Sequence, residues 1–342
     1  MKNSYKYLYS MGNLTIAWRK ARKGKASKPD VIEFEKNLMR NLLDLHYELK
    51  NKTYKPKSLT TFVLRDPKTR VISKSDFRDR VVHHAIILVI GSMFQKQFIY
   101  DSCANQINKG TTFALRRFDK FLRKVTNNLK QNAFCLKADI KHYFEEVNHA
   151  ILMSILSRRI KDNDILLLIE QILNNNVFRG GEKQKGMPLG NYTSQFFANV
   201  YLNELDYFVK NVLRAKYYIR YVDDFVILHK SKRQLSIWKE EIDKFLRSRL
   251  RIELHSQKSR IMPLYRGVDF IGFRSFYHFR LLRKRNIRSM KKKVELYKQG
   301  IIDFSTLKES YQGWQAYARW ADTYKLREEI KKKIIDILWD KI

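Results

Sequence analysis

The sequence predicts an α+β protein whose last part is a separate helical domain. Two pairs of short β-type runs, at residues 60–73 and 217–228, lie among longer stretches whose apolar residues recur at helical spacing. From about Asn286 onward only helical patterns occur. Strands and helices in this arrangement pack as layers around a hydrophobic core.

The charge of the chain limits the kinds of partner. The chain has 342 residues, of which 44% are hydrophobic, enough to bury a sizeable core in two or three domains. Its 69 Lys and Arg residues outnumber 34 Asp and Glu residues, which gives a net charge of +35. A polyanion that neutralises this charge is expected, and nucleic acid is the default partner. A membrane surface is the alternative, but the basic residues run along the whole chain and do not line one amphipathic helix.

The N-terminus and the cysteines bear on the compartment. Residues 1–13, MKNSYKYLYSMGN, contain no apolar core of the signal-peptide type, and no stretch is apolar enough to span a bilayer. Cys103 and Cys135 are too few for a disulfide framework or a zinc site, so we expect two buried thiols. The expected location is the cytoplasm, without a membrane partner.

The N-terminal third is predicted to contain two helices and a hairpin. Helical spacing of apolar residues predicts one helix over residues 31–52. Two β-rich runs over residues 60–73 predict a hairpin. Residues 79–94 form a predicted buried helix, in which His83 and His84 are expected to be packed or hydrogen-bonded and to have no chemical role.

The middle third supplies strands and the helices between them. In FCLKADI (134–140), Phe, Leu and Ala alternate with Cys, Lys and Asp, which predicts a strand that ends at Asp139. After the turn-rich residues 180–192, Thr193 or Ser194 is the expected N-cap of a helix. Further helices are predicted over residues 149–160, 163–173 and 234–250.

The C-terminal domain combines helix signals with a basic segment. Thr306 and Glu309 form a candidate capping box. The segment RLLRKRNIRSMKKK (280–293) is rich in basic residues and is expected to follow the backbone of a nucleic acid. The candidate nucleic-acid-binding residues are Arg280, Arg283, Lys284, Arg285, Arg288, Lys291 and Lys292.

Two adjacent acids, Asp223 and Asp224, stand between the apolar runs YYIRYV and FVIL. Both carboxylates cannot face an apolar core without a large desolvation cost, so either a turn exposes them or a cation holds them. An ordinary hairpin turn is the simple alternative. Asp139 supplies a third acid at another strand end, and the three converge if the strands are neighbours. Such a cluster favours magnesium, which also contacts phosphate oxygens, and therefore predicts phosphoryl transfer involving nucleic acid.

These residues resemble the palm of a reverse transcriptase, whose catalytic turn is Tyr-X-Asp-Asp. YVDDF (221–225) lies downstream of DIKHYF (139–144), and further motifs over residues 60–275 follow in the expected order. These motifs are RDPKTRVISKSDFRDRVVHHAI, CANQINKGTTFAL, GMPLGNYTSQFFANVYLNELD, LRIELHSQKSRI and GVDFIGF. The resemblance implies a right-hand polymerase whose fingers and palm combine an antiparallel sheet with helices. It divides the chain into an N-terminal segment with fingers (1–130), a palm (131–275) and a helical thumb (276–342).

The resemblance also implies roles for single residues. Asp139, Asp223 and Asp224 would be catalytic acids that, together with the Ile140 position, hold two Mg²⁺ ions. Lys258 would protonate the leaving pyrophosphate.

Deoxynucleoside triphosphates would be the substrates. Phe144 would be a steric gate against a 2′-hydroxyl, with an ordinary core aromatic as the alternative. For the basic candidates a solvated surface charge is the alternative. The other candidate nucleotide-binding residues are Arg65, Lys68, Arg70, Leu189, Gly190 and Gln195.

One departure from the general pattern points to a subgroup. Many bacterial relatives, including those of group II introns, have a glutamine before the second glycine of the GMPLG motif and Ser-Pro after it. This chain has Leu189 before Gly190, and then Ser194-Gln195, which resembles the reverse transcriptases of diversity-generating retroelements. Leu189 cannot make the hydrogen bonds of a glutamine, and that family misincorporates at template adenines. The resemblance therefore implies error-prone copying.

The implied partners follow from the same family. They are a structured template RNA, the cDNA or RNA–DNA hybrid, and a small basic oligomeric accessory protein. A defence-associated reverse transcriptase that reads a noncoding RNA in anti-phage immunity is a close alternative. A catalytically inactive RNA-binding scaffold is the alternative from a different class.

Overall fold

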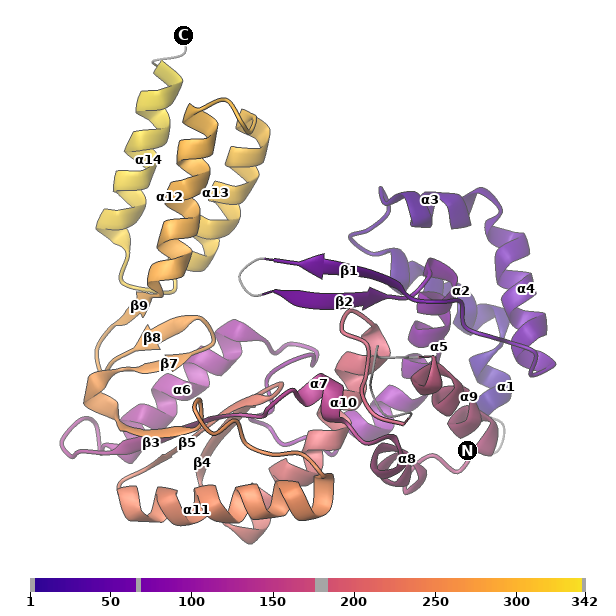
Figure 1. The fold of residues 1–342 in the computed structure, drawn as a ribbon, viewed down its shortest axis with the longest axis horizontal. Helices are drawn as coiled ribbons and strands as arrows, with labels where there is room; N and C mark the ends of the chain where they lie inside the picture. The colour runs from indigo at the N-terminus through magenta and orange to yellow at the C-terminus, as the bar shows by residue number, and fades with distance from the viewer. Residues whose placement is uncertain (1–3, 66–68, 176–183, 340–342) are drawn as a thin grey trace. The chain divides into compact units, whose positions relative to one another are not determined.

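The computed structural model describes residues 4–65, 69–175 and 184–339 (Figure 1). The chain divides into two compact units. Unit 1 comprises Met1–Ala114, Ala138–Val226 and Ile237–Ser259, and unit 2 comprises Leu115–Lys137, Ile227–Ser236 and Arg260–Ile342. None of the helices in the described ranges is both long and apolar enough to cross a membrane.

Unit 1 begins with helices that pack around the buried helix α5 (Phe77–Gln95). The surrounding helices are α1 (Ser4–Leu8), α2 (Met11–Arg22), α3 (Pro29–Lys36) and α4 (Leu38–Lys50). The single helix predicted over residues 31–52 is wrong, because the chain breaks at Asn37, whose φ of −124° lies outside the helical region. The break lets α3 and α4 each bury their own apolar residues.

Helix α5 is buried along most of its length, as predicted. His83 is buried and His84 stacks on Tyr192 with ring centroids 4.4 Å apart. Burial lowers the pKa of His83 to about 3 and that of His84 to about 4, so both rings are neutral at physiological pH. The prediction that these histidines are packed is confirmed.

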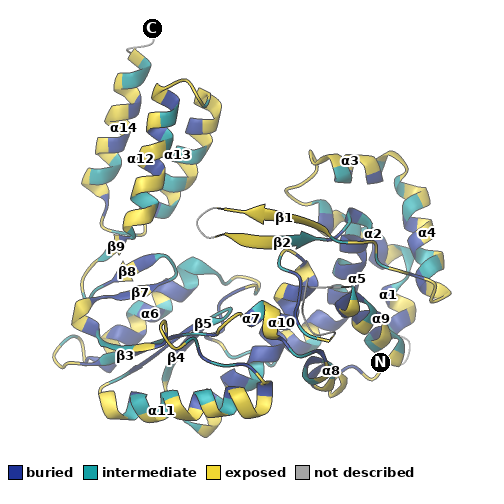
Figure 2. Ribbon diagram, in the orientation of Figure 1, coloured by how far each residue is buried: buried dark blue, intermediate teal, exposed yellow. Residues whose placement is uncertain are grey.

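A two-stranded ribbon extends from unit 1. Strands β1 (Thr60–Leu64) and β2 (Arg70–Lys74) pair antiparallel, with Leu64 opposite Arg70. The predicted hairpin is therefore confirmed, although its tip lies outside the described residues. The ribbon is largely exposed, in contrast to the sheet strands and α10 (Figure 2).

The central sheet has the strand order β4-β5-β3-β6. Its strands are β3 (Phe134–Asp139), β4 (Tyr217–Tyr221), β5 (Asp224–His229) and β6 (Arg260–Pro263). Strand β3 pairs antiparallel with β6. The middle of the chain also forms the helices α7 (Tyr143–Glu146), α8 (His149–Ser157), α9 (Asn163–Asn174), α10 (Tyr192–Tyr207) and α11 (Lys232–Phe245). Single π turns, Phe208–Val212 and Leu246–Leu250, follow α10 and α11.

The predicted cap of α10 is wrong. The N-cap is Asn191, and both Thr193 and Ser194 lie inside the helix and are buried. The Asn191 side chain makes no capping bond, since its Oδ1 accepts hydrogen bonds from the backbone N (3.2 Å) and Oγ (2.7 Å) of Ser75. This side chain therefore joins the start of α10 to the end of the β1–β2 ribbon.

Unit 2 contains α6 from Leu115 onward, a small sheet and three C-terminal helices. Their bounds are α6 (Thr111–Val125), β7 (Val268–Phe270), β8 (Phe273–Ser275), β9 (Arg280–Leu282), α12 (Lys284–Lys298), α13 (Phe304–Ala318) and α14 (Tyr324–Trp339). Met290, Leu307 and Ile330 form part of the core between the three helices. The predicted capping box is wrong, because Asp303 caps α13 and accepts from the Thr306 backbone N at 2.9 Å. The α+β class is confirmed.

Candidate active site

Three acidic residues lie at the ends of neighbouring strands. Asp139 is the last residue of β3, Asp223 lies in the loop after β4, and Asp224 begins β5. Strands β3 and β5 are adjacent in the sheet (Figure 1). All three residues belong to unit 1.

The three acids interact electrostatically. The pKa of Asp223 is raised to about 6, mainly by burial and then by the charges of Asp224 and Asp139. Arg70, at the start of β2, acts in the opposite direction. Asp224, Asp139 and Arg70 are therefore all close enough to affect the charge of Asp223, and the predicted metal-binding cluster stays a prediction.

Lys258 lies beside the acids. Its Nζ donates to Oδ2 of Asp139 at 2.8 Å, and the two side chains are 48% and 14% exposed. The segment that carries Lys258 also contacts the end of β3, because the His255 backbone N donates to the Asp139 carbonyl at 2.8 Å. The sequence prediction thus placed Lys258 in the right neighbourhood, and its proton-donating role stays a prediction.

The donor set suits a hard cation. Carboxylate oxygens are the ligands that Mg²⁺ prefers, and the raised pKa of Asp223 reflects burial first and then the like charges of Asp224 and Asp139. In the described ranges, no group of three or more His, Cys, Asp or Glu side chains is arranged to hold a metal ion as it stands. The Lys258 ammonium lies against Asp139 in this arrangement. Ile140 is buried, and its backbone forms an isolated bridge with Leu254.

The predicted nucleotide-binding residues are partly brought together by the ribbon. The Ser73 backbone N donates to the Leu189 carbonyl at 3.1 Å. Gly190 has φ +119°, and a Cβ at this position would lie 3.1 Å from Cγ2 of Ile72. Glycine therefore suits both the backbone and the close approach to β2. These contacts join Leu189 and Gly190 to the strand that begins at Arg70.

The other candidate nucleotide-binding residues in the described ranges take no part in these contacts with the ribbon. Phe144 is in α7, half-buried, and its carbonyl accepts from the Met187 backbone N at 2.6 Å. Arg65 and Gln195 are exposed. Lys68 lies outside the described residues. The roles of these residues stay predictions.

The basic segment of unit 2 contains two kinds of residue. Arg280 is only 11% exposed in its side chain, and its guanidinium donates to Asp119, Ser275 and the Trp320 carbonyl, which favours a structural role. Five of the predicted nucleic-acid-binding residues are exposed on α12, namely Lys284, Arg285, Arg288, Lys291 and Lys292. Arg283, just before α12, is half-buried and lies 3.9 Å from Asp269.

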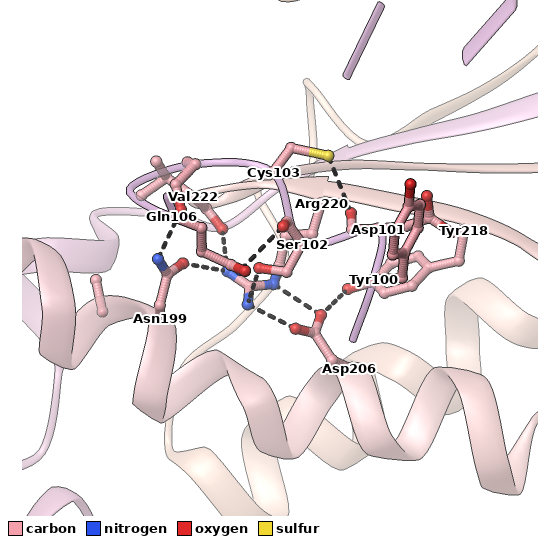
Figure 3. A network of polar contacts seen from close by, with 12 residues as sticks. Tyr100, Asp101, Ser102, Cys103, Gln106, Asn199, Asp206, Tyr218, Arg220 and Val222 are labelled. Atoms are coloured by element: carbon pink, nitrogen blue, oxygen red, sulfur yellow. Dashed lines mark hydrogen bonds and ion pairs between the residues drawn. The ribbon is translucent and has the colours of Figure 1, made fainter. Parts of the chain in front are cut away.

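Sequence reasoning missed a buried ion pair between β4 and α10. Arg220 of β4 and Asp206 of α10 are both 0% exposed, and Asp206 also accepts from the Tyr218 hydroxyl at 2.7 Å (Figure 3). Burial lowers the pKa of Arg220, but Asp206 more than offsets this, so the guanidinium stays charged. The available signals were an arginine within an apolar strand pattern and an aspartate on the apolar face of a helix.

Comparison with known proteins identifies the family. The model of the reverse transcriptase (RNA-dependent DNA polymerase) family matches residues 55–275. The chain belongs to the reverse transcriptase family. Its acidic turn and neighbouring strands thus lie within the matched region, and the prediction of an RNA-directed DNA polymerase is confirmed.

Individual relatives of this reverse transcriptase are distant. Protein YkfC of Escherichia coli K12 is 25% identical over 284 residues, which cover 72% of this chain and 70% of YkfC. Group II intron-encoded protein LtrA of Lactococcus lactis subsp. cremoris is 21% identical over 294 residues, which cover 66% of this chain. The match spans 48% of the length of LtrA.

Solved structures show the same fold. Telomerase from Candida albicans, in complex with a fragment of telomeric RNA, aligns with a TM-score of 0.52, 12% identity and coverage of 83% of this chain and 55% of that one. Telomerase from Candida tropicalis aligns with a TM-score of 0.51, 12% identity and coverage of 88% and 67%. The prediction of a right-hand polymerase fold is confirmed. The narrower likeness to retroelement or defence reverse transcriptases stays a prediction.

Proposed function

We propose that this chain copies a structured RNA into cDNA by two-metal-ion nucleotidyl transfer. The observation that carries the proposal is the position of Asp139, Asp223 and Asp224 at the ends of neighbouring strands, where the two neighbouring acids add to the effect of burial on the pKa of Asp223. A strongly basic chain with such an acidic cluster suits a reaction between a nucleic-acid end and a nucleoside triphosphate.

The three acids, with the Ile140 position, would hold the two Mg²⁺ ions. When bound, these ions activate the primer 3′-hydroxyl and neutralise charge on the triphosphate and pyrophosphate. Arg70 is exposed at the start of β2 and would bind the triphosphate. Lys258, whose Nζ donates to Asp139, would protonate the leaving pyrophosphate.

Two further residues would select the substrate. Phe144 would lie under the sugar and exclude a 2′-hydroxyl; its half-buried ring leaves part of its surface accessible. Leu189 would contact the nascent base pair with an aliphatic side chain, which supports error-prone synthesis. Sequencing cDNA made by Leu189→Gln tests this role, since an unchanged error spectrum would remove Leu189 from the fidelity argument.

We also propose which surface contacts the nucleic acid and how the chain divides into domains. The exposed cations of α12 would contact the template–primer backbone, in a thumb over residues 276–342 that follows the fingers segment (1–130) and the palm (131–275). The variant at Leu189 and Gln195 favours a diversity-generating retroelement, with a small basic accessory protein, over anti-phage defence. Sequencing the RNA that co-purifies with the protein distinguishes the two, because a template-repeat RNA supports the first and a defence-associated noncoding RNA the second.

Primer extension on an RNA template tests the catalytic proposal. Asp223→Asn should abolish DNA synthesis while RNA affinity stays nearly unchanged, because the substitution removes one charge without changing side-chain size. Asp336→Asn, at an exposed position of α14, is the matched control and should extend normally. Full synthesis by Asp223→Asn would refute the metal assignment, whereas the absence of synthesis by the unsubstituted protein would leave a nucleic-acid-binding scaffold.

A further inference from the structure

The turn that carries Asp223 has a strained backbone. Val222 and Asp223, both in the described part of the chain, are the two loop residues between β4 and β5. Val222 has φ +59°, in a region that β-branched residues rarely adopt. Glycine is the usual residue where the first position of such a loop has a positive φ. Interactions elsewhere must therefore hold Val222 in place.

A buried arginine contacts the strained residue directly. Nη1 of Arg220 donates to the Val222 carbonyl at 3.0 Å and to Oδ1 of Asn199 at 3.1 Å (Figure 3). Both Arg220 and Asn199 are almost completely buried. The guanidinium therefore reaches from the buried interior to the half-buried Val222 carbonyl.

Every N–H group of this guanidinium has an acceptor. Nε and Nη2 donate to the two carboxylate oxygens of Asp206 at 2.7 and 2.6 Å, and Nη2 also donates to Oγ of Ser102 at 3.1 Å. With the two bonds of Nη1, the five N–H groups of arginine are all used. Because the guanidinium is planar and rigid, its other partners fix the direction of the N–H that reaches Val222.

The backbone of Arg220 is anchored as well. Its N donates to the Asp101 carbonyl at 3.0 Å, and its carbonyl accepts from the Cys103 backbone N at 2.9 Å. These bonds hold the end of β4 against residues 101–103, next to the turn. The side chain and the main chain of Arg220 thus both constrain the position of the loop.

We propose that Arg220 is a positioning residue for DNA synthesis. Its guanidinium, oriented by Asp206, Asn199 and Ser102, holds the Val222 carbonyl and so keeps Asp223 where it acts. The inference rests on the proposed function, because it takes Asp223 as a metal-binding residue. It adds a residue that contacts neither substrate nor metal but determines where a catalytic carboxylate stands.

Arg220→Lys tests the role in primer extension. Lysine keeps a positive charge beside Asp206 but has only three N–H donors on a single nitrogen, so at least two of the five bonds are lost. We expect kcat to fall about 100-fold, while KM for the nucleotide and RNA affinity stay within about twofold. Tyr201→Phe is the matched control, because it removes one buried bond of α10, from the hydroxyl to the Leu250 carbonyl at 2.6 Å. It should lower Tm and leave kcat unchanged.

A second substitution separates positioning from general stability. Val222→Gly in the Arg220→Lys background should raise kcat about tenfold without restoring Tm, since glycine adopts positive φ without strain. Val222→Ala should not raise kcat, because alanine pays the same left-handed penalty. If Arg220→Lys does not fold, Ser102→Ala removes a single guanidinium bond and should lower kcat roughly fivefold, again with recovery by Val222→Gly.

Three outcomes would contradict the inference. The first is a normal kcat in folded Arg220→Lys or, where only Ser102→Ala folds, a normal kcat in that variant. The second is an equal change of kcat on adding Val222→Gly and on adding Val222→Ala. The third is a loss of kcat in Tyr201→Phe that accompanies its loss of Tm. An inactive Asp223→Asn with a normal Arg220→Lys would refute the positioning role alone. An active Asp223→Asn would instead refute the metal-binding role of Asp223 in the proposed function.

Discussion

Two clusters of charged residues include members of the β4–β5 hairpin, and they are built in opposite ways. Arg220 and Asp206 are fully buried and carry opposite charges, and each finds its partners within the protein. Asp223 and its neighbouring acids carry like charges, and the pKa of Asp223 rises as a result of burial and of these charges. The comparison separates a buried ion pair that supports the fold from an acid whose ionisation is disfavoured by burial and by its neighbours, and a perturbed acid of this kind is a candidate for a functional site.

The largest expected effect on stability comes from removing one partner of the Arg220–Asp206 ion pair. Asp206→Ala leaves the Arg220 charge buried and unpaired, so the free energy of unfolding should fall by about 3–5 kcal/mol. Glu204→Ala, on the same helix, removes an exposed ion pair with Arg158 and should cost at most about 1 kcal/mol. Urea denaturation of both variants measures the difference. Equal losses would show that the buried pair contributes no more than a surface pair.

A double substitution sharpens this result. Asp206→Leu combined with Arg220→Met replaces both charges by apolar groups and should recover most of the lost stability. The same protein should remain impaired in DNA synthesis, since the Val222 carbonyl has lost its donor. Recovery of both stability and kcat would contradict the positioning role of Arg220.

A smaller effect on stability is expected from reducing the charge repulsion at Asp223. In the presence of a chelator, Asp223→Asn removes one of the interacting charges and should raise the free energy of unfolding by up to about 1 kcal/mol. Asp336→Asn should change it by less than about 0.5 kcal/mol. Thermal unfolding in EDTA compares the two. A clear loss of stability in Asp223→Asn would mean that the carboxylate has a favourable structural partner.

The smallest effect concerns exposed charges that belong to neither cluster. Replacing Arg285 and Arg288 of α12 with alanine should weaken RNA binding and reduce the slope of log affinity against log salt by about 2 for a duplex backbone. Stability and kcat at saturating template should stay unchanged. Lys230→Ala combined with Lys232→Ala provides a control of equal charge. An equal loss of slope in both proteins would assign the effect to net charge and not to α12.

The comparison also shows how far sequence reasoning reached. The strand that ends at Asp139 and the turn at Asp223 follow from alternation and turn chemistry, which are local properties. The cap at Asn191 was missed because Thr193 and Ser194 are good capping residues in isolation, whereas the start of α10 is determined by the contact of Asn191 with Ser75. The role of Arg220 was missed because its partners lie on segments distant in sequence, and only the folded chain brings them together.

Binding of Mn²⁺, followed by electron paramagnetic resonance and by competition with Mg²⁺, tests the central claim most directly. Mn²⁺ also favours oxygen ligands, so it reports on the carboxylates without requiring catalysis. We predict saturable binding that Mg²⁺ displaces, with large losses in Asp139→Asn and Asp223→Asn and none in Asp336→Asn. Equal binding by all four proteins would contradict the claim that these acids form the metal site.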